Sequence, residues 1–131
     1  MDLKVLIKHL QEYGKPHTTC SWDNTGLLVE PSGAVFIKKI LLTCDLTESV
    51  FDEAIQENVD LIISYHPAIS FETTLKRLTQ ANWEERSIIK CIEKRIAVYS
   101  PHTTWDNKNG GINDWIMQAF GMFKRFLGSL L

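Results

Sequence analysis

Residues 60–67 (DLIISYHP) constrain the fold of this chain more than any other stretch, because a β-branched apolar run ends there at His66 and a proline. Residues 96–106 (IAVYSPHTTWD) repeat the pattern, with His102 directly after a proline. Such apolar runs are typical of strands buried on both faces of a parallel sheet, and proline ends a strand because it has no N–H to donate. Two parallel strands are therefore predicted. Their carboxyl ends would bring His66, His102 and Asp106 to the edge where open α/β sheets bind ligands.

The composition is that of one ordinary globular domain, with 131 residues, 44% hydrophobic residues, 23% charged residues and a net charge of −2. This balance offers no positive surface for nucleic acid or an anionic membrane, and no apolar run approaches the length of a bilayer span. The N-terminus lacks the apolar core of a signal peptide. We therefore expect an intracellular protein of the cytoplasm or nucleus that contacts proteins, not nucleic acid or membranes.

The three cysteines are Cys20, Cys44 and Cys91, an odd number with no C-x-x-C pair. This pattern indicates reduced, buried thiols in an intracellular protein. Because Cys44 ends an apolar run, it is expected in the core.

The predicted elements alternate as in an α/β protein. In chain order they are a helix over 3–10, strands at 27–29 and 39–44, a helix to 58, a strand at 61–65, a helix over 84–94, a strand at 96–99 and a helix over 112–120. A strand, helix and strand joined by crossovers of this length form a βαβ unit. The repeat predicts a mostly parallel sheet flanked by helices, with residues 68–82 mostly as a loop.

Two local patterns add detail. Asp45 with Glu48 resembles a capping box at the start of the second helix, and Thr47 is an alternative cap. The apolar residues of the last helix, including Trp115 and Phe120, lie at helical spacing and predict a core-facing helix.

The residues at the two strand ends fit a metal site, because divalent metals favour neutral imidazole and carboxylate ligands. The alternative is structural: a histidine at a strand end that is only hydrogen bonded, and Asp106 capping a turn. Tyr65 is expected either to orient a ligand or to pack in the core with its hydroxyl at the rim. The sequence contains no G-x-x-x-x-G-K-[ST], G-x-G-x-x-G or G-x-S-x-G motif, so a phosphate-binding loop and a serine nucleophile are not supported, and no catalytic residue is assigned.

Four ordered motifs resemble the NIF-three-like family, whose name abbreviates NGG-interacting factor three. They are residues 22–27 (WDNTGL), 43–47 (TCDLT), 64–67 (SYHP) and 102–106 (HTTWD), with residues 110–121 fitting as well. The Ser-Tyr-His-Pro form resembles the animal branch. The resemblance implies an α/β domain at residues 1–121, forming the N-terminal half of a two-part fold. Residues 122–131 form a divergent apolar tail, so we expect a fragment or a truncated isoform.

The resemblance also implies a dinuclear divalent-metal centre, with zinc, iron or manganese as candidate ions. His66 matches the second histidine of the family's His-His pair, Asp106 matches the aspartate of an H-x-x-x-D pattern, and His102 matches the first residue of that pattern. Tyr65 stands where many bacterial members have the first histidine, and the family's C-terminal His and Glu have no match here. A two-metal mechanism needs both ions held about 3.5–4 Å apart. Because the first histidine of the pair and the two C-terminal ligands have no match, we expect weak or absent metal binding and little or no catalytic activity.

Two functional hypotheses follow from the resemblance. The first is a protein-interaction module with a partial metal site, forming homo-oligomers and contacting transcriptional co-regulator proteins. The alternative is a divalent-metal-dependent hydrolase of small phosphorylated or nucleotide-like substrates, since some family members are described as GTP cyclohydrolase I type 2 homologs. Substitutions at His66 and Asp106 separate them, because only the enzyme needs the metal.

Overall fold

A computed structural model describes residues 1–14, 22–69 and 77–120. The strands are β1 (Gly26–Val29), β2 (Ile40–Thr43), β3 (Leu61–Ser64) and β4 (Ala97–Ser100). The helices are α1 (Leu3–Gly14), α2 (Glu48–Gln56), α3 (Trp83–Lys94), α4 (Thr103–Asp106), α5 (Ile112–Met117) and the short 3-10 helix η2 (Gln118–Phe120). The predicted tail at 122–131 and Cys20 lie outside the described residues. Within them, no helix has the length and apolar character needed to cross a membrane.

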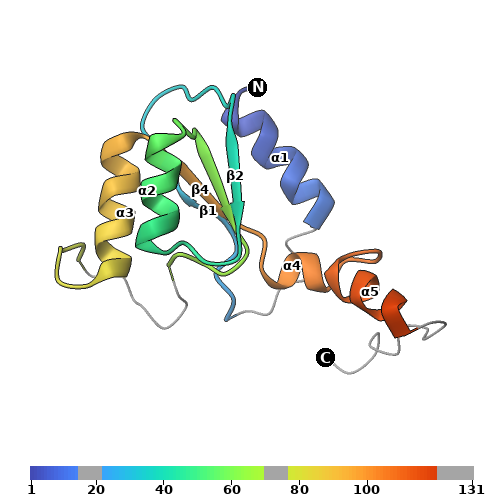
Figure 1. Cartoon of the computed structure of the whole chain (residues 1–131). Coiled ribbons are helices and arrows are strands. Elements are labelled where there is room, and N and C mark those ends of the chain that lie inside the picture. The colour runs from blue at the N-terminus through green and yellow to red at the C-terminus, as the bar shows by residue number, and fades with distance from the viewer. Residues whose placement is uncertain (15–21, 70–76, 121–131) are drawn as a thin grey trace.

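The strands form one sheet in the order β1-β4-β3-β2 (Figure 1). β3 runs parallel to both of its neighbours, with Leu61 opposite Ile40 on one side and Ala97 on the other. β1 pairs with β4 in the antiparallel direction, with Gly26 opposite Ser100. The predicted α/β class with a mostly parallel sheet is confirmed. Because β1 is antiparallel to β4, the turn before β1 lies at the carboxyl end of β4.

Helices cover both faces of the sheet, α2 and α3 on one face and α1 on the other (Figure 1). The side chains of β3 alternate between the two cores: Ile62 packs with α2 and α3, whereas Leu61 and Ile63 pack with α1. Every residue of β3 and β4 is buried. Burial on both faces explains why these two strands read as continuous apolar runs in the sequence.

The start of α2 differs from the capping box that the sequence suggests. The N-cap residue is Thr47, whose hydroxyl accepts a hydrogen bond from the Val50 N–H at 3.4 Å. The Asp45 side chain does not cap the helix with Glu48; its carboxylate contacts His66. Thr47 supplies the acceptor that the first turn of α2 needs. Asp45 is not needed as a cap, and its carboxylate is available to contact His66 at the edge of the sheet.

Two predictions about burial are wrong. Cys44 is exposed, because it follows the last residue of an edge strand. No residue of α5 is buried, Trp115 is 71% exposed and Phe120, in η2, is 66% exposed. α5 continues from α4 beyond the rim of the sheet and does not lie on either of its faces (Figure 1). Helical apolar spacing shows that one side of α5 is apolar, but it does not show what that side contacts.

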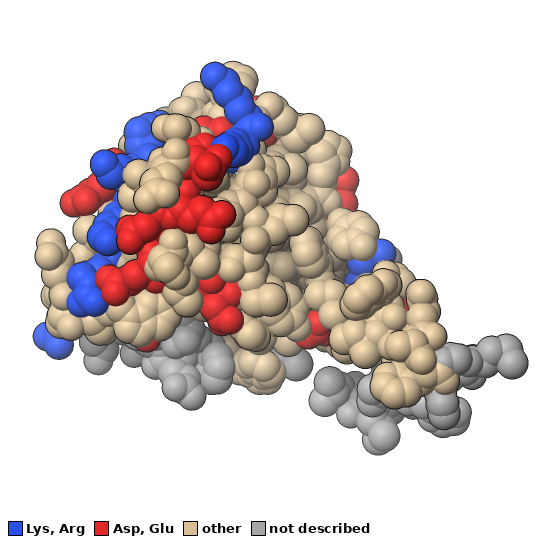
Figure 2. All heavy atoms as spheres, in the orientation of Figure 1, with Lys and Arg blue, Asp and Glu red and all other residues tan. Residues whose placement is uncertain are grey.

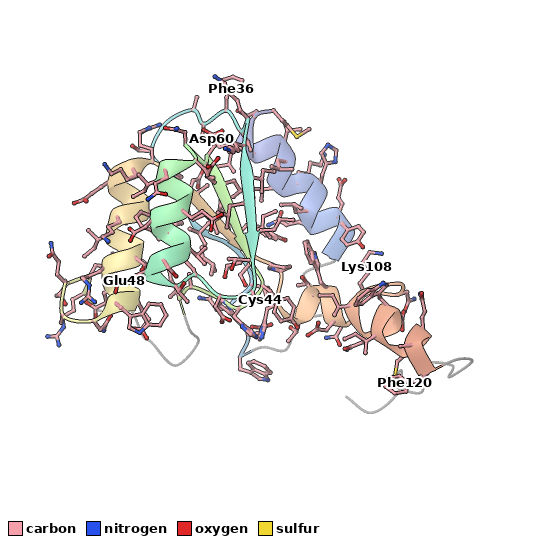
Figure 3. All side chains as sticks on the ribbon, viewed as in Figure 1. Phe36, Cys44, Glu48, Asp60, Lys108 and Phe120 are labelled. Atoms are coloured by element: carbon pink, nitrogen blue, oxygen red, sulfur yellow. The ribbon has the colours of Figure 1, made fainter. Side chains whose placement is uncertain are left out.

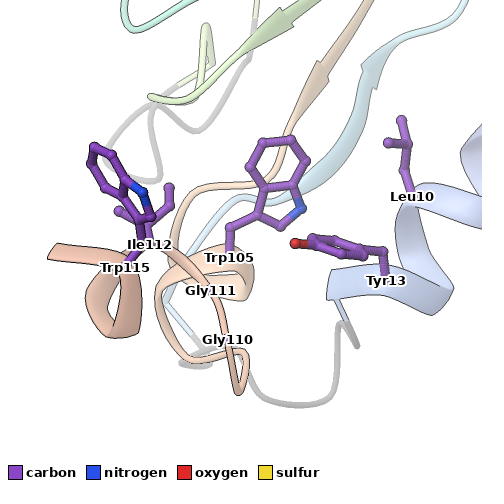
Figure 4. Close-up of a pocket in the computed structure, with 7 residues that line it drawn as sticks. All are labelled: Leu10, Tyr13, Trp105, Gly110, Gly111, Ile112 and Trp115. Carbon is purple, nitrogen blue, oxygen red and sulfur yellow. The ribbon is translucent and has the colours of Figure 1, made fainter. Parts of the chain in front are cut away.

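Trp105 fixes α4 against the end of α1. Its ring packs edge to face on Tyr13, with ring centroids 6.0 Å apart, and it joins the core cluster under α1. Gly111 passes so close that a Cβ there would lie 2.1 Å from the Trp105 carbonyl oxygen. These residues and Trp115 line an apolar cavity of about 470 Å³ (Figure 4). None of the histidines in the described residues lines this cavity. The packing of Trp105 fixes the position of α4, and α4 carries Asp106.

Candidate functional site

Three parallel strands end at one edge of the sheet, and each is followed two residues later by a carboxylate or an imidazole. Asp45 follows β2, His66 follows β3 and His102 follows β4. Asp23 joins them from the turn before β1, because β1 runs antiparallel to β4. Figure 3 labels Cys44 at this end of β2, the lower end of the sheet in that view. The chain therefore gathers two imidazoles and two carboxylates at the carboxyl edge, the usual ligand edge of α/β sheets.

Asp23 and His102 form the buried pair of the site. Nδ1 of His102 lies 2.7 Å from Oδ1 of Asp23, and the side chain of Asp23 has no exposed area. Thr103 donates to Oδ2 from its backbone N–H at 3.3 Å and also from its hydroxyl. Burial raises the pKa of Asp23, but the hydrogen bonds from Thr103 and His102 outweigh it and hold that pKa below its ordinary value. Asp23 is therefore a buried, fully hydrogen-bonded carboxylate anion.

His66 and Asp45 form a second pair of the same kind at the surface. Nδ1 of His66 lies 2.8 Å from Oδ1 of Asp45, and the two side chains are 53% and 61% exposed. The contact is open to water, so it adds little to stability. Its effect is on orientation, because it fixes which ring nitrogen of His66 faces the carboxylate.

Both pairs determine the tautomer of their histidine. A carboxylate only accepts hydrogen bonds, so Nδ1 of His66 and of His102 must carry the proton when the ring is neutral. Nε2 of each neutral ring then keeps its lone pair. Metal-ligating histidines usually donate their other ring N–H to a carboxylate or carbonyl, which is the arrangement found twice here.

The Tyr65 ring packs against both histidines. Its ring centroid is 5.0 Å from that of His66 and 5.6 Å from that of His102, and the two imidazole centroids are 5.8 Å apart. Its hydroxyl donates to the Asp106 carboxylate, 2.7 Å from Oδ1 and 2.8 Å from Oδ2. Burial raises the pKa of Tyr65, and the Asp106 carboxylate raises it further. Tyr65 therefore stays neutral at physiological pH, and its hydroxyl donates a hydrogen bond to the Asp106 carboxylate.

The backbone around the site is held by specific contacts. The Ser100 hydroxyl donates to the Tyr65 carbonyl at 2.9 Å, and the Ser64 hydroxyl donates to the His66 carbonyl at 2.8 Å. The bond from Ser100 ties the ends of β3 and β4 together, and the bond from Ser64 holds the turn that follows β3. His102 has φ 34° and ψ −126°, a conformation that non-glycine residues rarely adopt. Such strain tends to occur at functional sites, where the surroundings enforce it.

The structure brings together the three residues that the sequence singled out. His66 and His102 are neighbours, as predicted, and Asp106 reaches the group through Tyr65. Asp23 and Asp45 were not predicted to belong to the site. Each is the carboxylate that holds one histidine, and Asp23 could be found only by knowing that β1 runs antiparallel.

The residues present fit a divalent metal in part. Two imidazoles with oriented Nε2 atoms suit such an ion, whereas Asp106 is hydrogen bonded through both oxygens to the Tyr65 phenol. Within the described ranges, no three or more His, Cys, Asp or Glu side chains are grouped so that they could hold a metal ion. The described residues therefore offer two imidazole donors, which is fewer than a closed metal centre needs.

Comparison with known proteins identifies the family. The sequence model of the family described as Duf34/NIF3 (NGG1p interacting factor 3) matches residues 1–129. The chain belongs to the DUF34/NIF3 family. It is 49% identical to NIF3-like protein 1 of Drosophila melanogaster over 117 residues, which cover 89% of this chain and 39% of that protein. It is 40% identical over 114 residues to the NGG1-interacting factor 3 of Saccharomyces cerevisiae, covering 82% of this chain and 39% of that protein.

Solved structures agree with the DUF34/NIF3 assignment. The Bacillus cereus protein related to NIF3 is 31% identical and superposes with a TM-score of 0.82 over 95% of this chain and 33% of its own. HcgD of Methanocaldococcus jannaschii is 25% identical, with a TM-score of 0.82 over 95% of this chain and 48% of its own. The resemblance drawn from the four motifs is confirmed. This chain spans little more than a third of the length of the curated DUF34/NIF3 relatives given above.

Proposed function

We propose that this DUF34/NIF3 chain is a binding module that takes up one divalent metal ion weakly, through Nε2 of His66 and Nε2 of His102. The observation that carries the proposal is the pairing of each Nδ1 with a carboxylate, Asp45 for one ring and Asp23 for the other. This pairing leaves the two Nε2 atoms as the available donors on neighbouring rings. Imidazole ligands suit zinc and iron better than manganese, so zinc or iron is the expected ion.

The same geometry argues against efficient hydrolysis by this chain. Two imidazoles leave the remaining coordination positions to water, and the Asp106 carboxylate is hydrogen bonded to the Tyr65 hydroxyl through both of its oxygens. A two-metal hydrolase needs bridging ligands that hold both ions about 3.5–4 Å apart. We therefore place metal binding before the alternative function, hydrolysis of small phosphorylated or nucleotide-like substrates.

Zinc titration of the full chain tests the proposal. His66→Ala and His102→Ala should each weaken zinc binding at least about tenfold, since removal of even an outer-shell partner typically reduces metal affinity by roughly 10–100-fold. His9→Ala is the matched control, because His9 is a 62% exposed histidine on α1. Calorimetry at pH 7 measures all three variants. Unchanged zinc affinity in both site variants would refute the assignment.

A protein partner is a second candidate function, supported by the name of the yeast relative, NGG1-interacting factor 3. In this proposal the chain captures a co-regulator of the NGG1p type, in the cytoplasm or nucleus, through protein contacts. The net charge of −2 favours such a partner over nucleic acid. Purified NGG1p should bind the wild-type chain and the His66→Ala variant equally well in a pull-down assay. Failure of the wild-type chain to bind would end this candidate and leave the zinc result untouched.

A further inference from the structure

The apolar cavity of about 470 Å³ lies between the end of α1 and the segment that carries α4 and α5 (Figure 4). Most of its wall is aromatic or aliphatic, with Leu10 and Tyr13 from α1, Trp105 from α4, and Ile112 and Trp115 from α5. Figure 2 shows charges gathered over α2 and α3, whereas the surface over α4 and α5, at the lower right, is mostly uncharged. This volume and this lining are typical of a small-molecule site.

One polar group at the cavity has no partner. The indole N–H of Trp105 is buried, and no acceptor among the described residues binds it. A buried donor without an acceptor destabilises the folded state, so such a group needs an explanation, such as a bound molecule that accepts from it. Figure 4 shows the indole nitrogen on the side of the ring that faces Tyr13. Tyr13 is 51% exposed, so its ring can turn outward with little loss of packing and open the N–H to a ligand.

The charge beside the cavity is a lysine ammonium. Nζ of Lys108 lies 4.1 Å from the centroid of the Tyr13 ring, and it donates to the Asn109 carbonyl at 3.1 Å. Figure 3 labels Lys108 between the end of α1 and α5. No carboxylate in the described ranges lines the cavity, and Asp114, close by, accepts a hydrogen bond from the Gly110 N–H at 2.6 Å. An ammonium over an aromatic wall attracts an anion and repels a cation, so the charge favours an anionic ligand.

We propose that this cavity binds a small planar aromatic carboxylate. The flat ring of such a ligand packs against the aromatic side chains of the wall, which favour stacked or edge-to-face contacts. Its carboxylate accepts the hydrogen bond of the Trp105 indole N–H and faces the ammonium of Lys108. Both of these groups adjoin the Tyr13 ring, so one carboxylate reaches them together.

NMR of the tryptophan indole N–H groups tests the proposal on the full chain, with naphthoate as the probe. The Trp105 signal should shift as a new acceptor binds, and the shift should saturate with a dissociation constant below about 1 mM. Trp22 and Trp83 are internal controls, because neither lines the cavity, and their signals should stay in place. No saturable shift at Trp105 would overturn the proposal. The same result is expected if another segment of the chain or a second copy fills the cavity.

A matched cation tests the charge of the ligand. Naphthylmethylammonium has the same ring system as naphthoate, and it should bind at least about tenfold more weakly because Lys108 repels it. Lys108→Ala should remove this preference, whereas Lys4→Ala, at the other end of α1, should retain it. Equal binding of the two probes to the wild-type chain would contradict a carboxylate site.

A substitution that fills the cavity tests the location. Ile112→Trp places a larger side chain in the cavity wall and should weaken naphthoate binding at least about tenfold. Ile116→Trp is the matched control, because Ile116 lies on the same helix, is 45% exposed and does not line the cavity. It should bind naphthoate as the wild type does. Equal affinity of the two folded variants for naphthoate would show that the probe binds elsewhere.

Discussion

Replacing Asp23 by alanine is expected to lower the free energy of unfolding by about 3 kcal/mol, because it leaves partly buried donors without their acceptor. The carboxylate of Asp23 is fully buried and accepts hydrogen bonds from the Thr103 backbone, the Thr103 hydroxyl and Nδ1 of His102. These bonds join the turn before β1 to the start of α4. Urea denaturation at pH 7 measures the loss.

Asp45→Ala is the matched control, since Asp45 makes the same contact to a histidine Nδ1 at an exposed position. It should change the free energy of unfolding by less than about 1 kcal/mol. Equal effects of the two substitutions would show that burial of the Asp23 pair is not what stabilises this end of the sheet.

The effect of Asp23→Ala should also depend on pH in a defined direction. The folded pKa of Asp23 is lower than its ordinary value, so the stability gained from the ionised carboxylate is present above about pH 4. It is lost as the pH falls through the lower folded pKa. The difference between wild type and Asp23→Ala should therefore be full at pH 7 and shrink in acid. A difference that grows on acidification would contradict this account.

Tyr65→His should raise the zinc affinity of the chain at least about tenfold, which corresponds to about 1.4 kcal/mol of binding free energy. The Tyr65 ring packs beside both imidazoles, and its hydroxyl is within hydrogen-bond distance of both oxygens of Asp106. An imidazole at position 65 adds a third nitrogen donor and removes the phenol from Asp106. Calorimetric titration of the variant against the wild type measures the gain.

Tyr65→Phe distinguishes the two causes of that gain. It removes the hydroxyl from Asp106 but adds no ligand, so its zinc affinity should lie between those of the wild type and Tyr65→His. If Tyr65→His bound zinc no better than Tyr65→Phe, position 65 would not face the ion. The two-imidazole site would then be placed wrongly.

The strands and their order of occurrence could be read from the sequence, because β3 and β4 are buried on both faces and leave continuous apolar runs. The direction of β1 could not be read. A four-residue strand pairs where tertiary contacts allow, and its sequence is equally compatible with either direction. The exposure of α5 could not be read either. Helical periodicity shows that one side of a helix is apolar, but it does not show whether the described chain covers that side.

The sequence predicted that His66, His102 and Asp106 lie close together, but it did not predict the contacts that support them. His66 and His102 follow adjacent parallel strands, so their proximity follows from topology alone. The carboxylates that orient them come from the end of an edge strand and from a turn whose position depends on β1. Asp45 also satisfied a helix-capping pattern, a local explanation that hid its contact with His66. Local patterns identify the residues, but tertiary structure decides which partner each one takes.

Nitrogen-15 NMR of the imidazole rings during a zinc titration reports each ring nitrogen separately, so it shows which nitrogen of each histidine binds the ion. We expect zinc to shift the Nε2 signals of His66 and of His102, while both Nδ1 atoms keep their protons and their contacts with Asp45 and Asp23. The Nε2 signal of His9 should not move at the same zinc concentration. Zinc-induced loss of the Nδ1 protons, or shifts confined to His9, would contradict a metal site built on carboxylate-held histidines.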